Sequence, residues 1–219
     1  MSEDLPEILG VALLETLYMT FGASLIGLLM GLPLAVILVT TRKGHILESE
    51  AIHKSLAFVI NMTRSFPAII LIVLLLPLAR WLVGTSLGMH AALVPLSIGA
   101  APFIARVLET SLNDVPFGKV EAALALGANP WQVIRKVLIP EALPSLIRGI
   151  TVSVIAVLGL TAIAGTIGAG GLGSLAIRYG YQRFREDVMI STTVLLVLIV
   201  QLTQWLGDRL AITFSSERT

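Results

Sequence analysis

Length, composition and charge point to a membrane protein and exclude several classes of function. Of the 219 residues, 56% are hydrophobic and 13% are charged, whereas soluble domains carry fewer apolar residues and about twice this share of charges. The formal net charge of +1 indicates no particular partner, and no basic stripe with interleaved aromatic residues indicates nucleic-acid binding. Because cysteine is absent, disulfides, iron–sulfur clusters and thiol catalysis are excluded together.

Runs without charged residues predict the membrane spans, because a charge at the bilayer centre costs roughly 2.5 kcal/mol or more. Residues 1–10 contain Glu3, Asp4 and Glu7 but no Lys or Arg. They therefore lack the basic start of a cleavable signal peptide, and we expect the first span to be permanent. Four uninterrupted runs follow in chain order, at 16–41, 81–105, 149–177 and 188–207.

A further run, before residue 81, is interrupted by charge. The uncharged residues 65–79 alone are too few to cross a core of roughly 30 Å at about 1.5 Å per residue. We expect this span to extend past Arg80, which can reach the interface beside Trp81, with Arg64 at the opposite rim. Arg64 either orders the inner mouth of the span by bonding to neighbouring carbonyls or is a rim arginine facing lipid headgroups, and both interpretations stay open.

These spans predict the fold class and the orientation. We expect an all-α integral membrane protein with five transmembrane helices. Its five spans are expected near 12–41, 56–83, 88–110, 145–166 and 187–208. With a cytoplasmic C-terminus, the outside holds Arg80, Arg178, Arg183 and Arg185, and the other eleven of the 15 Lys and Arg residues lie inside. This asymmetry favours an outer N-terminus and a cytoplasmic C-terminus.

Small residues and prolines inside the spans add detail. Gly27 and Gly31 have the spacing that lets helix backbones approach closely in lipid. A contact with a second copy and packing within the chain's own bundle both remain open. Several prolines also interrupt helices and invite kinks, namely Pro33, Pro67, Pro77, Pro95 and Pro102.

The longest inner segment, 106–148, carries too many charges to span the membrane, yet it predicts two short helices. Residues 119–126 favour a helix that ends at Gly127 in a left-handed conformation. The N-cap, first-turn proline and capping partner of a second helix are Asn129, Pro130 and Gln132. Helical spacing places four apolar residues on or near one face of this second helix, namely Trp131, Ile134, Val137 and Leu138.

This inner segment resembles the EAA pattern of ABC importer permeases, which is E-A-A, three residues, G, nine residues, then I-x-L-P. The residues at these positions are Glu121, Ala122, Ala123, Gly127, Val137, Ile139 (at the leucine position) and Pro140. Val137 departs from the pattern, being valine where isoleucine is usual. In that family the segment is the coupling helix, which docks in a cleft of the ATP-hydrolysing subunit. The resemblance implies the same ATPase-coupling role for residues 115–140.

A wider resemblance covers about 12–206. The stretches "RSFPAIILIVLLLP", "VGTSLG", "AALVPLSIGAAPFIARVLE", "RKVLIPEALP" and "IGAGGLG" are similar to the methionine importer permease family. This resemblance implies a multi-pass protein of the bacterial cytoplasmic (inner) membrane that forms the pathway for D- or L-methionine. It further implies three partners: a second copy of the chain, two ABC ATPase subunits and an extracytoplasmic methionine-binding lipoprotein. ATP and magnesium would be bound by the ATPase, so we expect no cofactor, metal or catalytic residue on this chain.

The acidic and histidine residues bear on other classes of function. An ABC permease for another small amino acid or an osmolyte stays open. A secondary transporter needs intramembrane ionisable groups, but the candidate acids fall at or beyond the span ends. These acids are Glu15, Glu109, Glu186 and Asp187. An intramembrane enzyme is also disfavoured, because the scattered His45, His53 and His90 form no metal or nucleophile motif.

Candidates for the pathway or its gate lie among the polar and small residues of the last three spans. They are Ser97, Ser153, Thr161, Ile163, Thr166, Gly168, Gly170, Gly171 and Gly173. Three of these glycines have the G-x-G-x-x-G spacing of a dinucleotide-binding loop, but no strand precedes them and a span follows, so that interpretation fails.

The glycine run at 168–173 is instead expected in the outer connection before the last span. One hypothesis is a flexible connection near the external gate, contacted by the binding protein through Tyr179, Tyr181 or Arg183. The alternative is a tight turn without a gating role.

Overall fold

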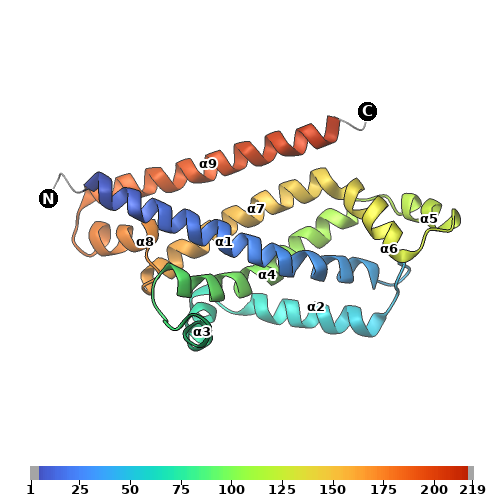
Figure 1. Ribbon diagram of the computed structural model, residues 1–219, viewed down its shortest axis with the longest axis horizontal. Coiled ribbons are helices and arrows are strands. Elements are labelled where there is room, and N and C mark those ends of the chain that lie inside the picture. The colour runs from blue at the N-terminus through green and yellow to red at the C-terminus, as the bar shows by residue number, and fades with distance from the viewer. Residues whose placement is uncertain (1–4, 217–219) are drawn as a thin grey trace. The chain divides into compact units, whose positions relative to one another are not determined.

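The computed structural model describes residues 5–216, and every regular element in this range is helical (Figure 1). The α-helices are α1 (Leu5–Thr40), α2 (Glu50–Ser65), α3 (Ala68–Val83), α4 (Met89–Asn113), α5 (Phe117–Ala125), α6 (Pro130–Val133), α7 (Ile139–Thr166), α8 (Gly171–Leu175) and α9 (Glu186–Ser216). Two π-helical segments are η1 (Ile134–Leu138) and η2 (Ala176–Tyr181). The predicted all-α class is confirmed for the described residues, while Glu3, Asp4 and Arg218 lie outside them.

Four stretches of helix are long and apolar enough to cross a membrane. They are α1, α4, the stretch Pro130–Thr166 that joins α6, η1 and α7, and most of α9. A fifth span exists only if α2 and α3 together form one broken span. The described chain is therefore built as a multi-pass membrane protein, and its predicted orientation remains a prediction.

The span expected over 56–83 is broken between α2 and α3, at Pro67, where a kink was expected. Pro67 has φ −57° and ψ 132° and precedes the first residue of α3. A proline cannot donate a backbone hydrogen bond, and its ring disfavours a helical conformation in the residue before it, here Phe66. With 16 residues, α3 alone is about 24 Å long and cannot cross a core of roughly 30 Å.

A second difference concerns the start of the fourth predicted span. The expected short helix after Asn129 does not end; it continues through η1 into α7, so that one helical stretch runs Pro130–Thr166. In η1 the backbone widens, and Ile139 N–H bonds Ile134 O five residues back. Pro140 follows directly and has no N–H to give to the preceding turn, so a widened turn before it accommodates its ring.

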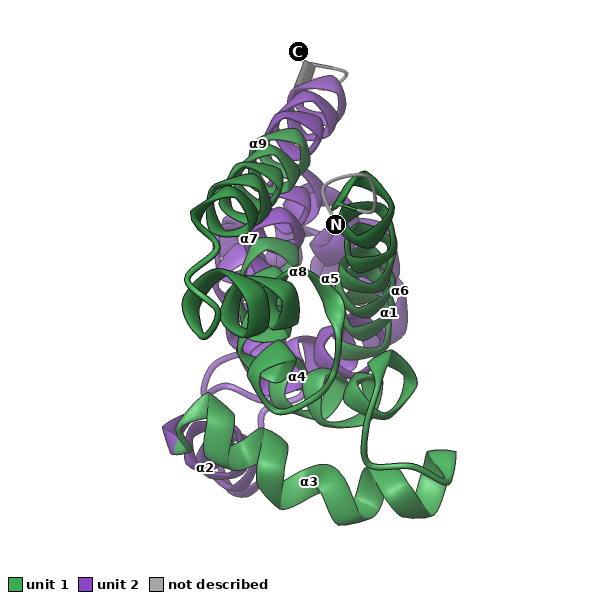
Figure 2. Ribbon diagram, turned by 90° about the vertical axis from the view of Figure 1, so that its left-hand side faces the viewer, with its two compact units in different colours: residues 1–27, 66–100, 154–204 green, residues 28–65, 101–153, 205–219 purple. Residues whose placement is uncertain are grey.

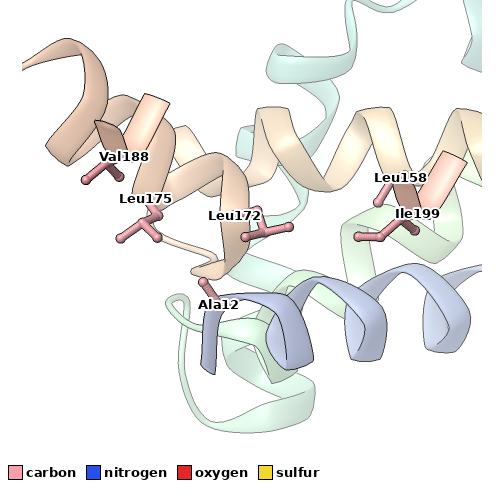
Figure 3. Packing of buried hydrophobic residues seen from close by; sticks show 6 residues of the cluster. All are labelled: Ala12, Leu158, Leu172, Leu175, Val188 and Ile199. Carbon is pink, nitrogen blue, oxygen red and sulfur yellow. The ribbon is translucent and has the colours of Figure 1, made fainter. Parts of the chain in front are cut away.

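The chain forms two compact units, each with its own core (Figure 2). Unit 1 contains residues 5–27, 66–100 and 154–204, and unit 2 contains residues 28–65, 101–153 and 205–216. In unit 1, side chains of α1, α7, α8 and α9 form one apolar cluster (Figure 3). Its buried members are Ala12, Leu158, Leu172, Leu175, Val188 and Ile199. In unit 2, Leu38, Ile60 and Ala105 join α1, α2 and α4.

Polar contacts also hold α2 against α4 within unit 2. Arg106 donates to Asn61 Oδ1 at 3.0 Å and to Ala57 O at 3.4 Å, and its guanidinium pairs with Glu109 at 2.7 Å. Glu109 and Arg106 are both mostly shielded from solvent, so their mutual neutralisation lowers the cost of placing either charge there. The acid thus serves a structural ion pair.

Gly31 packs against the chain's own α4. A methyl group at Gly31 would lie 2.9 Å from both the Ala101 carbonyl oxygen and Ile104 Cγ2. These contacts support packing within the chain's own bundle as the role of this glycine, because small residues let helix backbones approach closely.

We predict that Gly31→Ala lowers the thermal unfolding midpoint of the purified protein. The added methyl overpacks the α1–α4 contact, which costs about 1–3 kcal/mol in a tightly packed core. Gly10→Ala is the matched control, since a methyl there meets nothing within 4 Å and alanine favours helix more than glycine. Equal midpoints for the two variants would contradict the assignment of Gly31 to this contact.

Candidate functional site

The segment predicted to couple to an ATPase lies in unit 2 and begins with α5, which ends at a glycine turn. Gly127 has φ +84°, its N–H bonds Leu124 O at 2.9 Å, and Ala128 N–H bonds Ala123 O at 3.1 Å. Together these bonds form a Schellman motif, which satisfies the last carbonyls of a helix around a left-handed residue. The predicted left-handed stop at Gly127 is confirmed.

The next helix begins with the predicted cap. Asn129 Oδ1 accepts the Gln132 N–H at 2.9 Å, and Gln132 Oε1 accepts the Asn129 N–H at 2.9 Å. Pro130 fills the first helical position, where its missing N–H costs no hydrogen bond. Two caps of known geometry therefore fix both sides of the turn between α5 and α6, and the capping-box prediction is confirmed.

The coupling segment has a buried side and a bare side. Its buried apolar residues are Val120, Val133, Ile134 and Leu138. By contrast, Trp131 is 66% exposed and Leu126 is 89% exposed. The four apolar residues predicted on or near one face differ in burial: Ile134 and Leu138 are buried, Val137 is partly buried, and Trp131 is exposed in the first turn, where Val133 is buried instead. The bare side thus presents large apolar side chains that no other described part of the chain covers.

The residues of the EAA pattern divide between these two sides. Exposed members are Glu121, Ala122 and Gly127, and partly buried ones are Ala123, Val137, Ile139 and Pro140. The exposed members belong to α5 and its glycine turn, whereas most of the partly buried ones belong to η1 and the start of α7. The pattern therefore links an exposed surface to the packed base of a long helix.

Polar contacts anchor the start of the segment to α7. Lys119 Nζ lies 2.6 Å from Glu141 Oε2, and Ser145 Oγ donates to Asp114 Oδ2 at 2.6 Å. Ser111 Oγ also donates to the Ser145 carbonyl at 3.1 Å. The lysine pair is partly exposed, so it contributes at most about 1 kcal/mol. Its main effect is to define where α5 lies against α7.

The loop between α1 and α2 contacts the same segment. The rings of His45 and Phe117 lie 5.5 Å apart between centroids. Burial, and then the nearby positive charge of Arg42, lower the pKa of His45. His45 is therefore neutral at pH 7, and an uncharged ring packs against the first residue of α5.

The second candidate region is the glycine run, which lies in unit 1 between α7 and α8. Gly170 and Gly171 have φ +89° and +76°, a region that residues with a Cβ rarely adopt. Two side chains of α1 bond this turn: Glu15 Oε2 accepts the Gly171 N–H at 2.6 Å, and Thr16 Oγ1 accepts the Leu172 N–H at 2.8 Å. The turn is bonded and largely buried, and Gly171 begins a helix, while the flexibility that one hypothesis gave this connection stays a prediction.

Close approach of backbones explains a further part of the glycine spacing. A methyl group at Gly173 would lie 2.5 Å from Cα and O of Ala162, and one at Gly165 would lie 2.5 Å from Ser174 N. The end of α7 and α8 therefore touch backbone to backbone. The glycines of the motif allow a turn and a helix contact, which agrees with rejecting the nucleotide interpretation. A gating role remains a prediction.

The predicted pathway hydroxyls bond to their own helices. Ser97, Ser153 and Thr161 are buried, and each donates to a carbonyl three or four residues back at 2.6–2.8 Å. Thr166 is exposed and donates to Ile163 O at 2.7 Å. Such local bonds satisfy a hydroxyl inside an apolar helix without any ligand. For the three buried residues this placement favours a packing role.

Arg64 lies at the surface. Arg64 is exposed in the last turn of α2 and bonds no other residue within 5–216, so the structure gives no support to the carbonyl-bonding interpretation.

Tyr181 and Arg183 are exposed, and the Arg183 guanidinium lies 4.5 Å from the ring centre of the half-buried Tyr179. Phe184, at φ +55°, is 87% exposed beside them and was not predicted.

Glu15 was also missed as a site residue. It lies within α1 rather than at the end of a helix, and its partner Gly171 is 156 residues away in the chain. An acid next to a charge-free run was the available signal, but a contact at this separation leaves no local pattern in the sequence.

Comparison with known proteins adds independent findings. Residues 27–212 match the family described as "Binding-protein-dependent transport system inner membrane component". The chain is 46% identical to a probable D-methionine transport system permease protein of Vibrio cholerae, covering 93% of this chain and 91% of that protein. It is 48% identical to a methionine import system permease protein of Bacillus subtilis, covering 89% and 87%. A chain from inward-facing conformations of the MetNI methionine ABC transporter superposes with a TM-score of 0.96 at 44% identity, covering 98% and 99%.

We predict that Gly170→Ala destabilises the glycine turn by about 2 kcal/mol, seen as a lower unfolding midpoint of the purified protein. With φ 89° and ψ −161°, Gly170 lies in a region essentially restricted to glycine, where an alanine costs roughly 1–3 kcal/mol. In addition, the methyl would lie 2.6 Å from Glu15 Oε2 and displace the carboxylate from Gly171. Gly159→Ala in α7, where a methyl meets nothing within 4 Å, is the control and should be neutral or stabilising. A Gly170 variant as stable as this control would show that the turn tolerates rearrangement.

Proposed function

Since the chain belongs to the family of binding-protein-dependent transport system inner membrane components, we propose that it is the permease subunit of an ATP-driven methionine importer. Two observations support methionine as the substrate: the names of relatives at 46% and 48% identity, and the TM-score of 0.96 to a chain of a methionine ABC transporter. The observation that carries the coupling role is the preformed, bare surface of α5 and its glycine turn.

The proposed assembly has a second copy of this chain, two cytoplasmic ABC ATPase subunits and an extracytoplasmic methionine-binding lipoprotein. It works in the bacterial cytoplasmic membrane, with the N-terminus outside. The ATPase subunits bind ATP and magnesium and hydrolyse the nucleotide, and this chain supplies the pathway. Substantial exposed apolar surface on α9 supports contact with lipid or with the second copy, since such patches mark membrane or protein contacts.

Coupling begins on the bare side of the inner segment. Glu121 and Ala122 lie on α5, and Leu126 and Trp131 project near the glycine turn, so an ATPase cleft would cover apolar surface that is exposed in the isolated chain. The Schellman turn, the capping box and the Lys119–Glu141 pair give this surface a defined geometry. Because α6, η1 and α7 form one helical stretch, movement of the turn would be transmitted along the whole of Pro130–Thr166.

The outer face would receive the binding protein. Three exposed residues lie close together in the sequence: Tyr181 at the end of η2, and Arg183 and Phe184 in the connection to α9. Aromatic and arginine side chains are enriched where protein interfaces form. These residues are therefore the proposed contact surface for methionine-loaded lipoprotein.

The decisive test is reconstitution of the complex in liposomes with its ATPase and binding protein. We expect uptake of labelled methionine that requires ATP, is abolished by vanadate and is competed by unlabelled methionine more strongly than by other amino acids or osmolytes. Uptake driven by an ion gradient without the ATPase would overturn the importer function. Stronger competition by a different solute would overturn only the substrate.

We predict that Gly127→Asp and Glu121→Lys leave membrane insertion intact but reduce ATP-dependent uptake at least about tenfold. Asp would add a charge and a Cβ at φ +84°, and Lys would reverse the charge of the bare α5 surface. Gly118→Ala, also exposed on α5 with open space around it, should transport normally. If the purified variants bind the ATPase and transport as wild type does, α5 and its turn are not the coupling element.

A further inference from the structure

A groove of about 410 Å³ lies within unit 1, between the first turns of α1 and the helical pair α8 and η2. One wall comes from Glu7, Val11 and Glu15 and their neighbours on α1, and the other from Gly170 to Tyr179. Its volume falls in the range of roughly 300–1,000 Å³ that is typical of small-molecule sites. Two residues of the lining, Ala12 of α1 and Leu175 of α8, also belong to the apolar cluster of unit 1 (Figure 3).

Charges of both signs line this groove. Glu7 and Glu15 come from α1, and Arg178 comes from η2. The side chains of Glu7 and Arg178 make no hydrogen bond or ion pair with another residue in the described range 5–216. Glu15 is half-buried and is held in place by the Gly171 N–H at 2.6 Å. An open guanidinium and a positioned carboxylate thus share one cavity without neutralising each other directly.

Apolar side chains form the rest of the lining. Val11 and Ile8 lie on the α1 side, and Leu175 and the ring of Tyr179 lie on the other. A ligand that fits this lining carries an ammonium group for the carboxylates, a carboxylate for the guanidinium and an apolar side chain for the walls. Charge-assisted bonds of guanidinium to carboxylate are among the strong hydrogen bonds in proteins.

We propose that this groove binds a zwitterionic α-amino acid with an apolar side chain, namely the transported substrate, on the outer side of the permease. The outward position of the groove and the identity of its ligand as the transported substrate rest on the proposed function. The zwitterionic character of the ligand follows from Glu15, Arg178 and the apolar walls. Arg178 binds the ligand carboxylate, and Glu15 binds its ammonium while keeping its bond to Gly171. The ligand therefore contacts the glycine turn at the end of α7 through the residue that holds that turn.

The test is equilibrium dialysis of labelled L-methionine against the purified permease–ATPase complex without the binding protein. Arg178→Gln and Glu15→Gln should each weaken binding about tenfold or more, because each removes one charge-assisted contact. Glu15→Gln retains an amide oxygen that can accept the Gly171 N–H, so the fold of the turn is preserved. Arg178 is exposed, so its variant tests the site without disturbing a core. Arg80→Gln, an exposed arginine away from the groove, is the control and should bind as wild type does.

Two outcomes would overturn the proposal. One is methionine binding by both charge variants with wild-type affinity. The other is a groove occupied by a zwitterionic phospholipid headgroup, seen by mass spectrometry as phosphatidylethanolamine that wild type retains and the variants lose while methionine binding is unchanged. Whether methionine is the transported substrate is tested separately, by uptake in liposomes. If the wild-type complex takes up another amino acid, that amino acid replaces methionine as the probe, and a tenfold loss in the variants still supports the groove.

Discussion

Backbone N–H and C=O groups have no water to bond in the hydrocarbon core of a membrane, and each unsatisfied group costs several kcal/mol. This requirement accounts for a chain whose regular elements within 5–216 are all helical. The backbone is also bonded at two interruptions of the helices. At Gly127, in a segment too charged to span the membrane, a Schellman motif bonds the freed carbonyls, and at Gly171 and Leu172 side chains of α1 accept the freed N–H groups. At both turns the protein itself supplies the partners.

In both candidate regions the protein bonds the backbone of the turn, but the hydrogen-bond partners lie at different separations along the chain. The coupling turn is satisfied by residues within six positions in the chain, so it keeps its geometry as a local unit and leaves its outer side bare. The glycine turn is satisfied by Glu15 and Thr16, which lie on a different helix. Its geometry therefore depends on α1 staying in place. Contact with the exposed side of the first turn leaves its hydrogen bonds intact, whereas a displacement of α1 would break the hydrogen bonds of the second turn.

This difference also explains what could be predicted from the sequence. The stop at Gly127 and the Asn129–Gln132 capping box were predictable, because each is a local pattern of residue types with its own hydrogen bonds. The interruption at Pro67 was predicted only as a kink, and the widened turn before Pro140 was not predicted, because a proline can kink, end or merely widen a helix depending on what surrounds it. Glu15 was missed because its partner is remote. The pathway hydroxyls were chosen for polarity, but local bonds to their own helices account for that polarity equally well.

The continuous stretch Pro130–Thr166 limits where residues can be inserted or deleted. Its first turn carries the capping box beside the coupling surface, and its last residue precedes the glycine turn. Since an α-helix turns by about 100° per residue, one inserted or deleted residue anywhere between these ends would rotate one end relative to the other by that angle. The faces of both ends would then no longer meet their neighbours. A substitution along this stretch changes packing at one position, but a change of length rotates every residue beyond it about the helix axis.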